Sequence, residues 1–195
     1  IDFYSKNISI KINDNKYEIN GDVNNTKQKI KKAKINKFFD KLDNVVDDSL
    51  FFSSISNFNL LLSKKYKILN FSSKSEIRIN EIGYKIDNKY LKNSLGIKNN
   101  INFLDQIVTI NLNGNSFKKN KLKMEISGLG KISVNGKIDK IKYNVKNDKN
   151  KKIINFETLL NNNFVNLKIL NYYKPSKSES KFKIEDDILY NNKLN

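Results

Sequence analysis

The sequence predicts a mainly β protein, an antiparallel meander that forms a curved sheet or groove and carries one amphipathic helix. Apolar and polar residues alternate along most of the chain, turn signals separate the alternating segments, and helical periodicity occurs in a single segment. Strands that follow one another without intervening helices pair antiparallel. We therefore expect residues 1–195 to form a single β-rich domain or a segment of a longer chain.

The first alternating segment predicts a β-hairpin. Residues 8–12 and 17–19 carry isoleucine or tyrosine at every second position, and Asn13-Asp14-Asn15 lies between them. Asparagine and aspartate favour tight turns because their side chains hydrogen-bond to the nearby backbone.

Residues 26–48 show a different period and predict the helix. Apolar residues recur there at steps of three and four, as they do on the buried face of an amphipathic helix. Lysines dominate the first turns and aspartates the last, which is unfavourable for the helix dipole, so we expect this helix to depend on packing. The apolar stripe consists of Ile35, Phe38, Phe39, Leu42, Val45 and Val46.

From Ser49 onward the alternation of a β-strand returns and persists. Asn113-Gly114 and Asn135-Gly136 each lie between alternating apolar residues, which predicts two hairpin turns. Gly83 and the triplet Gly128-Leu129-Gly130 predict further breaks between short strands.

The charge of +17 comes almost entirely from lysine, because Arg78 is the only arginine among 37 basic residues. Residues with GC-rich codons are scarce and lysine, asparagine and isoleucine are abundant, which is typical of an AT-rich genome. Specific readers of nucleic acid favour arginine for its two-pronged contacts to guanine and phosphate. The lysine-rich composition thus favours a solvated surface over a specific nucleic-acid interface.

Several chemistries are excluded by composition. The chain contains no histidine and no cysteine, which removes histidine-dependent triads, cysteine nucleophiles and ordinary zinc sites. We expect a non-enzymatic protein with no catalytic residues, no metal and no cofactor.

No run of residues approaches the roughly 18 apolar residues that a membrane-spanning helix needs. The chain begins with Ile1 and not with methionine, so we expect a processed product or an internal piece. This leaves room for a signal peptide or a membrane anchor upstream.

Residues 121–173 repeat a pattern of short strands separated by glycine turns. In residues 122–138 a short strand, a Gly-x-Gly turn, a second strand, an Asn-Gly turn and a third strand follow one another, and residues 8–21 show a looser version. This pattern resembles the AsmA/TamB-type envelope proteins of diderm bacteria. The resemblance implies a cell-envelope location such as the periplasm. It also implies an elongated curved sheet whose apolar inner face carries lipid acyl chains between membranes, with no catalytic residues to carry over.

The candidate ligand-binding residues are the apolar positions of the strands in this region. Alternation alone does not distinguish a face that is covered by a second layer from an open face that is covered by acyl chains. Neighbouring β segments are further candidate partners at the sheet edges. The candidate residues are Val108, Ile110, Leu112, Leu122, Met124, Ile126, Ile132, Val134 and Ile138.

Two other functions remain open on the sequence. A basic module would bind nucleic acid or anionic surfaces through residues 27–37 and nearby lysines of the strands, with an affinity that falls steeply with salt. A surface β domain would bind a protein partner through an exposed apolar patch.

Overall fold

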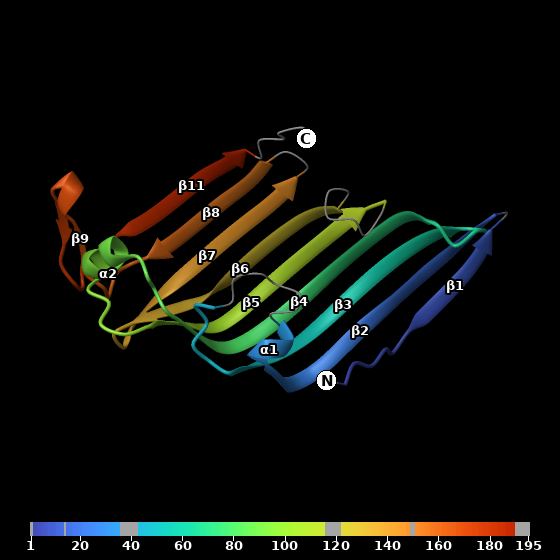
Figure 1. Ribbon diagram of the computed structural model, residues 1–195, viewed down its shortest axis with the longest axis horizontal. Helices are drawn as coiled ribbons and strands as arrows, with labels where there is room; N and C mark the ends of the chain where they lie inside the picture. Colours follow the sequence, from blue (N-terminus) through green and yellow to red (C-terminus); the bar gives the residue numbers. More distant parts are fainter. Residues whose placement is uncertain (1, 14, 36–42, 116–121, 149–150, 190–195) are drawn as a thin grey trace.

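The computed structural model describes residues 2–13, 15–35, 43–115, 122–148 and 151–189 (Figure 1). Most of them form one open sheet of nine antiparallel strands in the order β1-β2-β3-β4-β5-β6-β7-β8-β11. The predicted mainly β, antiparallel meander is therefore confirmed. The strands are β1 (Ile8–Asn13), β2 (Lys16–Lys31), β3 (Ser49–Ser63), β4 (Ile68–Tyr84), β5 (Ile101–Gly114), β6 (Leu122–Val134), β7 (Lys137–Asp148), β8 (Lys151–Leu159) and β11 (Lys181–Leu189).

The remaining elements are short. A separate hairpin consists of β9 (Val165–Leu167) and β10 (Tyr172–Lys174), with the 3-10 turn η2 (Lys168–Leu170) between them. The two helices of the described residues are α1 (Lys32–Ile35) and α2 (Lys89–Leu95). These elements are too few to form a second layer over the nine strands, and Figure 1 shows the sheet as a single layer.

The strands are long for a soluble protein, in which five or six residues are usual. β4 has 17 residues and β2 has 16, which corresponds to roughly 55 Å at about 3.3 Å per residue. The only proline of the chain is Pro175, outside the sheet, so no residue inside the strands lacks a backbone donor.

Two predicted hairpins are confirmed. Residues 8–13 pair with residues 16–21 in an unbroken antiparallel register. Asn135 and Gly136 connect β6 to β7, and both have positive φ, 50° and 80°. A two-residue hairpin of this kind needs positive φ at both central positions, which explains why Asn-Gly serves it.

Other glycine signals were misinterpreted. Asn113 and Gly114 lie inside the end of β5, which pairs on both sides, and do not form a turn. Gly83 lies inside β4, and Gly128 and Gly130 lie inside β6, so neither site breaks a strand. A Cβ at Gly128 would overlap the ring of Tyr143. These glycines make room for neighbouring side chains, which is a second common role of glycine in a strand.

The predicted helix over residues 26–48 is wrong over its first part. Residues 26–31 continue β2, where Ile30 pairs with Leu50 of β3. In residues 26–35 and 43–48, the part of this region that the structure describes, the helical residues are those of α1, and Val45 forms an isolated antiparallel bridge with Tyr84. Phe38, Phe39 and Leu42 of the predicted stripe lie outside the described residues.

The second helix, α2, was not predicted. Asn88 caps its first turn by accepting a hydrogen bond from the backbone N–H of Leu91, at 3.0 Å. Gly96 ends it in the left-handed conformation with φ 58°. The ring of Phe164, next to β9, lies against Gly96, so α2 and the β9–β10 hairpin are neighbours.

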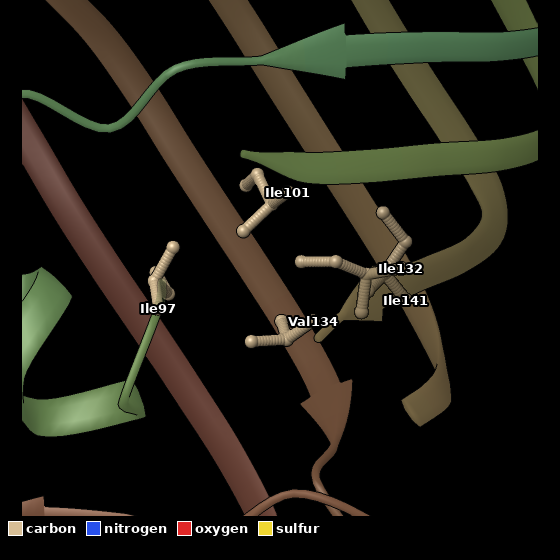
Figure 2. Packing of buried hydrophobic residues seen from close by; sticks show 5 residues of the cluster. All are labelled: Ile97, Ile101, Ile132, Val134 and Ile141. Atoms are coloured by element: carbon tan, nitrogen blue, oxygen red, sulfur yellow. The ribbon is translucent and has the colours of Figure 1, made fainter. Parts of the chain in front are cut away.

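The buried core is small and lies at one end of the sheet. Ile97, which follows α2, packs there with Ile101 of β5, Ile132 and Val134 of β6 and Ile141 of β7 (Figure 2). Val134 is fully buried. Among the residues that the structure describes, a second element therefore covers the sheet at this end alone.

Candidate functional site

One face of the sheet is apolar, and the strand register identifies it. Paired residues of adjacent antiparallel strands project from the same side of a sheet. Ile110 pairs with Ile126, Ile126 with Val145, and Val145 with Ile154, which makes one apolar row across β5, β6, β7 and β8. We call this side the apolar face. Its half-buried apolar residues away from α2 include Phe58, Leu60, Phe71, Ile77, Val108, Ile110, Leu112, Met124, Ile126, Val145 and Ile154.

Six of the nine sequence-derived candidates lie along this row and its neighbours. Val108, Ile110 and Leu112 pair with Gly128, Ile126 and Met124 respectively. Leu122 begins β6 opposite Gly114. These residues come together as the alternation predicts. Because the described residues provide no second layer above this row, the partial burial of Val108, Ile110, Leu112, Met124 and Ile126 comes from neighbours on the same face.

The other three candidates lie elsewhere. Ile132 and Val134 continue the apolar face along β6, but they are 7% and 0% exposed in the core beneath the α2 region. Ile138 pairs with Ser133 and lies on the opposite side of the sheet, where it is 46% exposed. The grouping of Ile138 with Val134 was wrong, because the two-residue turn pairs Val134 with Lys137 and turns Ile138 to the other face.

A strip of small residues, missed in the sequence, divides the apolar face. Ser56 pairs with Ser75 and Ser73 pairs with Phe58, so serines of β3 and β4 lie between larger apolar residues. Ser73 also pairs with Leu112 of β5. An open hollow of about 450 Å³ lies behind the row of Phe58, Ser73 and Leu112, on the opposite side of the sheet, where it is lined mainly by Asn57, Asn59, Ser72, Lys74, Asn111 and Asn113. We call Ser56, Ser73 and Ser75 the serine strip; the register of β3 and β4 brings these residues together, and the sequence of either strand alone does not mark them.

Gln106 is a buried polar residue within the apolar face, where it pairs with Ile79. It is 3% exposed, and its Nε2 donates to the carbonyl oxygens of Leu104 (2.8 Å) and Lys131 (2.9 Å). These bonds bridge β5 and β6 where their register shifts. Gly130 leaves the space that the amide fills. Gln106 therefore supports the bulge between the covered and open parts of the face.

The opposite face is polar and carries many of the charges. Glu125 accepts a hydrogen bond from Asn144 Nδ2 (3.0 Å) and lies 3.2 Å from Lys146 Nζ. The bond from Asn144, followed by that from Lys146, holds the pKa of Glu125 below its ordinary value. Glu18 likewise accepts from Asn59 Nδ2 (3.1 Å). The sheet is thus amphipathic, with a hydrogen-bonded polar face behind the apolar one.

A further feature is the edge of the sheet that β1 forms. An open hollow of about 820 Å³ there is lined by residues of β1, β2, β3 and the segment before β1, Ile8, Gly21 and Phe58 among them. Asp22 accepts backbone hydrogen bonds from Lys6 (3.2 Å) and Asn7 (2.7 Å). The Lys6 bond is the largest cause that lowers the pKa of Asp22. Asp22 therefore fixes the chain entering β1.

Comparison with protein-family models finds no match for this chain. Comparisons with curated proteins and with solved structures find no significant similarity either.

The described residues contain no cluster of three or more acidic, histidine or cysteine side chains that could hold a metal ion. Neither α1 nor α2, the helices of the described ranges, is long and apolar enough to cross a membrane.

Proposed function

We propose that this chain is a non-enzymatic segment of a cell-envelope protein, which binds or conducts lipid by covering its apolar face with acyl chains. The observation that carries the proposal is the open apolar face itself. A row of four apolar residues, including Ile110 and Ile126, crosses β5–β8 without a covering layer among the described residues. A contiguous apolar surface without a covering layer is typical of a binding surface.

The serine strip supplies a place for a chain to lie. Phe58 and Leu112 lie on either side of the smaller Ser73 on the apolar face, and no element of the described residues covers this row. A linear methylene chain fits such a strip because it is narrow and needs no hydrogen-bond partners. Each buried methylene contributes about 0.8 kcal/mol, so ten of them contribute roughly 8 kcal/mol before the cost of association.

The proposal is tested by loading of the purified chain with lipid. We expect native mass spectrometry to detect bound phospholipid or fatty acid, and solvent extraction to identify it. After delipidation, a fluorescent fatty-acid analogue should bind again. Unlabelled competitors should lose affinity with each pair of methylenes removed, between about fourfold for half-buried and about 15-fold for fully buried methylenes.

Two matched variants test where the lipid lies. Ile126→Lys places a charge in the middle of the apolar face, whereas Ile138→Lys makes the same change on the polar face. We expect Ile126→Lys to abolish loading and Ile138→Lys to preserve it, with circular dichroism as the check that both variants fold. Equal loading of the two variants would remove the apolar face as the binding site.

Salt separates this proposal from the basic-module alternative. Binding to an apolar surface changes little with ionic strength, whereas binding of a polyanion to lysines falls steeply as salt rises. A chain that never loads lipid but binds polyanions at low salt would favour the alternative.

A further inference from the structure

The sheet has two free edges in the described part of the chain. β1 pairs only with β2, and β11 pairs only with β8. An edge strand leaves alternate backbone N–H and C=O groups unpaired and can accept another strand, unless charge, proline or irregularity blocks it.

The β11 edge is blocked by charge. Lys181, Lys183, Glu185 and Asp186 are all exposed on this strand. Lys181 Nζ lies 3.1 Å from Glu157 Oε2 of β8, and Lys183 Nζ lies 2.6 Å from Glu185 Oε1. A strand added here would have to displace water from several charges.

The β1 edge lacks this protection. Its sequence, Ile-Ser-Ile-Lys-Ile-Asn, contains one charge, Lys11, and no proline. Ile8, Ile10 and Ile12 are 63%, 61% and 73% exposed, although they project from the same face as the half-buried residues of the inner strands. Each has a neighbour in β2 on one side only. The apolar face thus runs to an open rim.

We propose that this rim is closed by a second copy of the chain, through antiparallel pairing of the two β1 strands about a two-fold axis at Ile10. In this register Ile10 lies opposite Ile10 of the second copy, Ile8 lies opposite Ile12, and Ser9 lies opposite Lys11. A two-fold axis normal to the sheet keeps both apolar faces on the same side.

The sequence of β1 selects this register over its neighbours. A shift that centres the pair on Lys11 would place two lysines opposite each other, which is destabilising. A shift that centres it on Ser9 leaves two isoleucine pairs instead of three. A shift by a single position places Ile8 opposite Lys11 or Asn13. The bulged segment before Ile8, held by Asp22, limits the regular edge to β1.

The proposed pairing of the two β1 strands does not depend on the proposed lipid function. It would produce one sheet of eighteen described strands with a continuous apolar face and the charged β11 strands at both outer edges. We expect sedimentation and light scattering of the delipidated chain to give twice the protomer mass of 22.7 kDa.

Cysteine trapping tests the register, because the chain has no cysteine of its own. Ile10→Cys places two thiols on directly opposed residues, at a Cα separation of about 5 Å that a disulfide can span. We expect this variant to form a covalent dimer under mild oxidation. Ile8→Cys alone should not, because residue 8 of the second copy lies about 13 Å further along the strand. The Ile8→Cys, Ile12→Cys double variant should cross-link again.

A matched pair of charge variants tests the surface without disulfides. Ile10→Lys should give a monomer, whereas Ile55→Lys, at a position 60% exposed on the polar face of β3, should remain dimeric. The proposal is overturned by a monomer at all concentrations. It is also overturned if Ile8→Cys cross-links as well as Ile10→Cys, since that indicates another register or random collision. None of these readouts requires lipid, so they fail or succeed separately from the loading experiment.

Discussion

The contact between Gly128 and Tyr143 makes a sharp test of why glycine interrupts an otherwise apolar strand. Gly128 of β6 pairs with Tyr143 of β7, and a Cβ at position 128 would overlap the tyrosine ring. Burial also raises the pKa of the Tyr143 hydroxyl, which agrees with a ring held down against the sheet. Gly128→Ala should therefore push the ring away from its place.

The expected magnitude follows from two opposing effects. Overpacking a filled site costs about 1–3 kcal/mol, and replacing glycine by alanine inside a strand returns about 0.5–1 kcal/mol. We expect Gly128→Ala to lower the free energy of unfolding by about 0.5–2 kcal/mol. In a Tyr143→Ala background the obstacle is gone, and the same substitution should raise the free energy of unfolding by about 0.5–1 kcal/mol.

Urea unfolding of the four proteins of this double-mutant cycle, followed by circular dichroism, measures both effects. A coupling free energy of about 1–3 kcal/mol between positions 128 and 143 would support the reasoning. If Gly128→Ala had the same effect in both backgrounds, the ring would not be the reason for the glycine, and the break in the strand pattern would need another cause.

Two further predictions concern stability. Val134→Ala should lower the free energy of unfolding by about 2–3 kcal/mol because Val134 is fully buried, whereas Ile138→Ala should lower it by less than about 1 kcal/mol. Urea unfolding compares the two variants, and an equal loss of stability would contradict the assignment of the two residues to different faces. The depressed pKa of Glu125 stabilises the fold above the pKa of the unfolded chain, and this contribution is lost as the pH falls through the lower folded pKa. Glu125→Gln should therefore flatten the loss of stability between neutral and acidic pH, and an unchanged pH profile of the urea midpoint would count against it.

Local signals were sufficient where the structure is local. The hairpin of residues 8–19 and the turn at Asn135-Gly136 need only alternation and a pair of residues that accept positive φ. The same dipeptide at Asn113-Gly114 forms no turn, because both residues are paired within the sheet. An Asn-Gly pair thus indicates that the backbone can turn at that position. Whether it does turn depends on how the flanking residues pair within the sheet.

The helix prediction failed for a related reason. In residues 26–31 one apolar residue, Ile30, is set among polar ones, and this short pattern fits a helical as well as a strand period. Pairing with β3 decides the matter in favour of the strand, because context outweighs intrinsic preference. The helix α2 had clear end signals in Asn88 and Gly96, but its seven residues are too short for a periodic stripe.

For the candidate site, the sequence predicts which residues of one strand share a face, but it does not predict which residues of neighbouring strands lie side by side. Alternation placed Ile110 and Ile126 correctly, while the face of Ile138 depended on counting through the turn. The serine strip depends on register alone: Ser56 and Ser75 are unremarkable within their own strands and form a feature only because β3 and β4 align them. Such a feature depends on the register between two strands, and the alternation within either strand does not reveal it.

The order of the strands also bears on how the molecule acquires and loses its structure. Every pairing in the large sheet joins strands that follow one another in the chain, except that of β8 with β11. Contacts between sequence neighbours form at a low cost in loop closure, and their free energies add approximately as they do in repeat arrays. We therefore expect the outer strands β1 and β11 to exchange their amide hydrogens well before the central ones. Opening would progress inward from the rims, with the small core beneath α2 as the last region to lose protection.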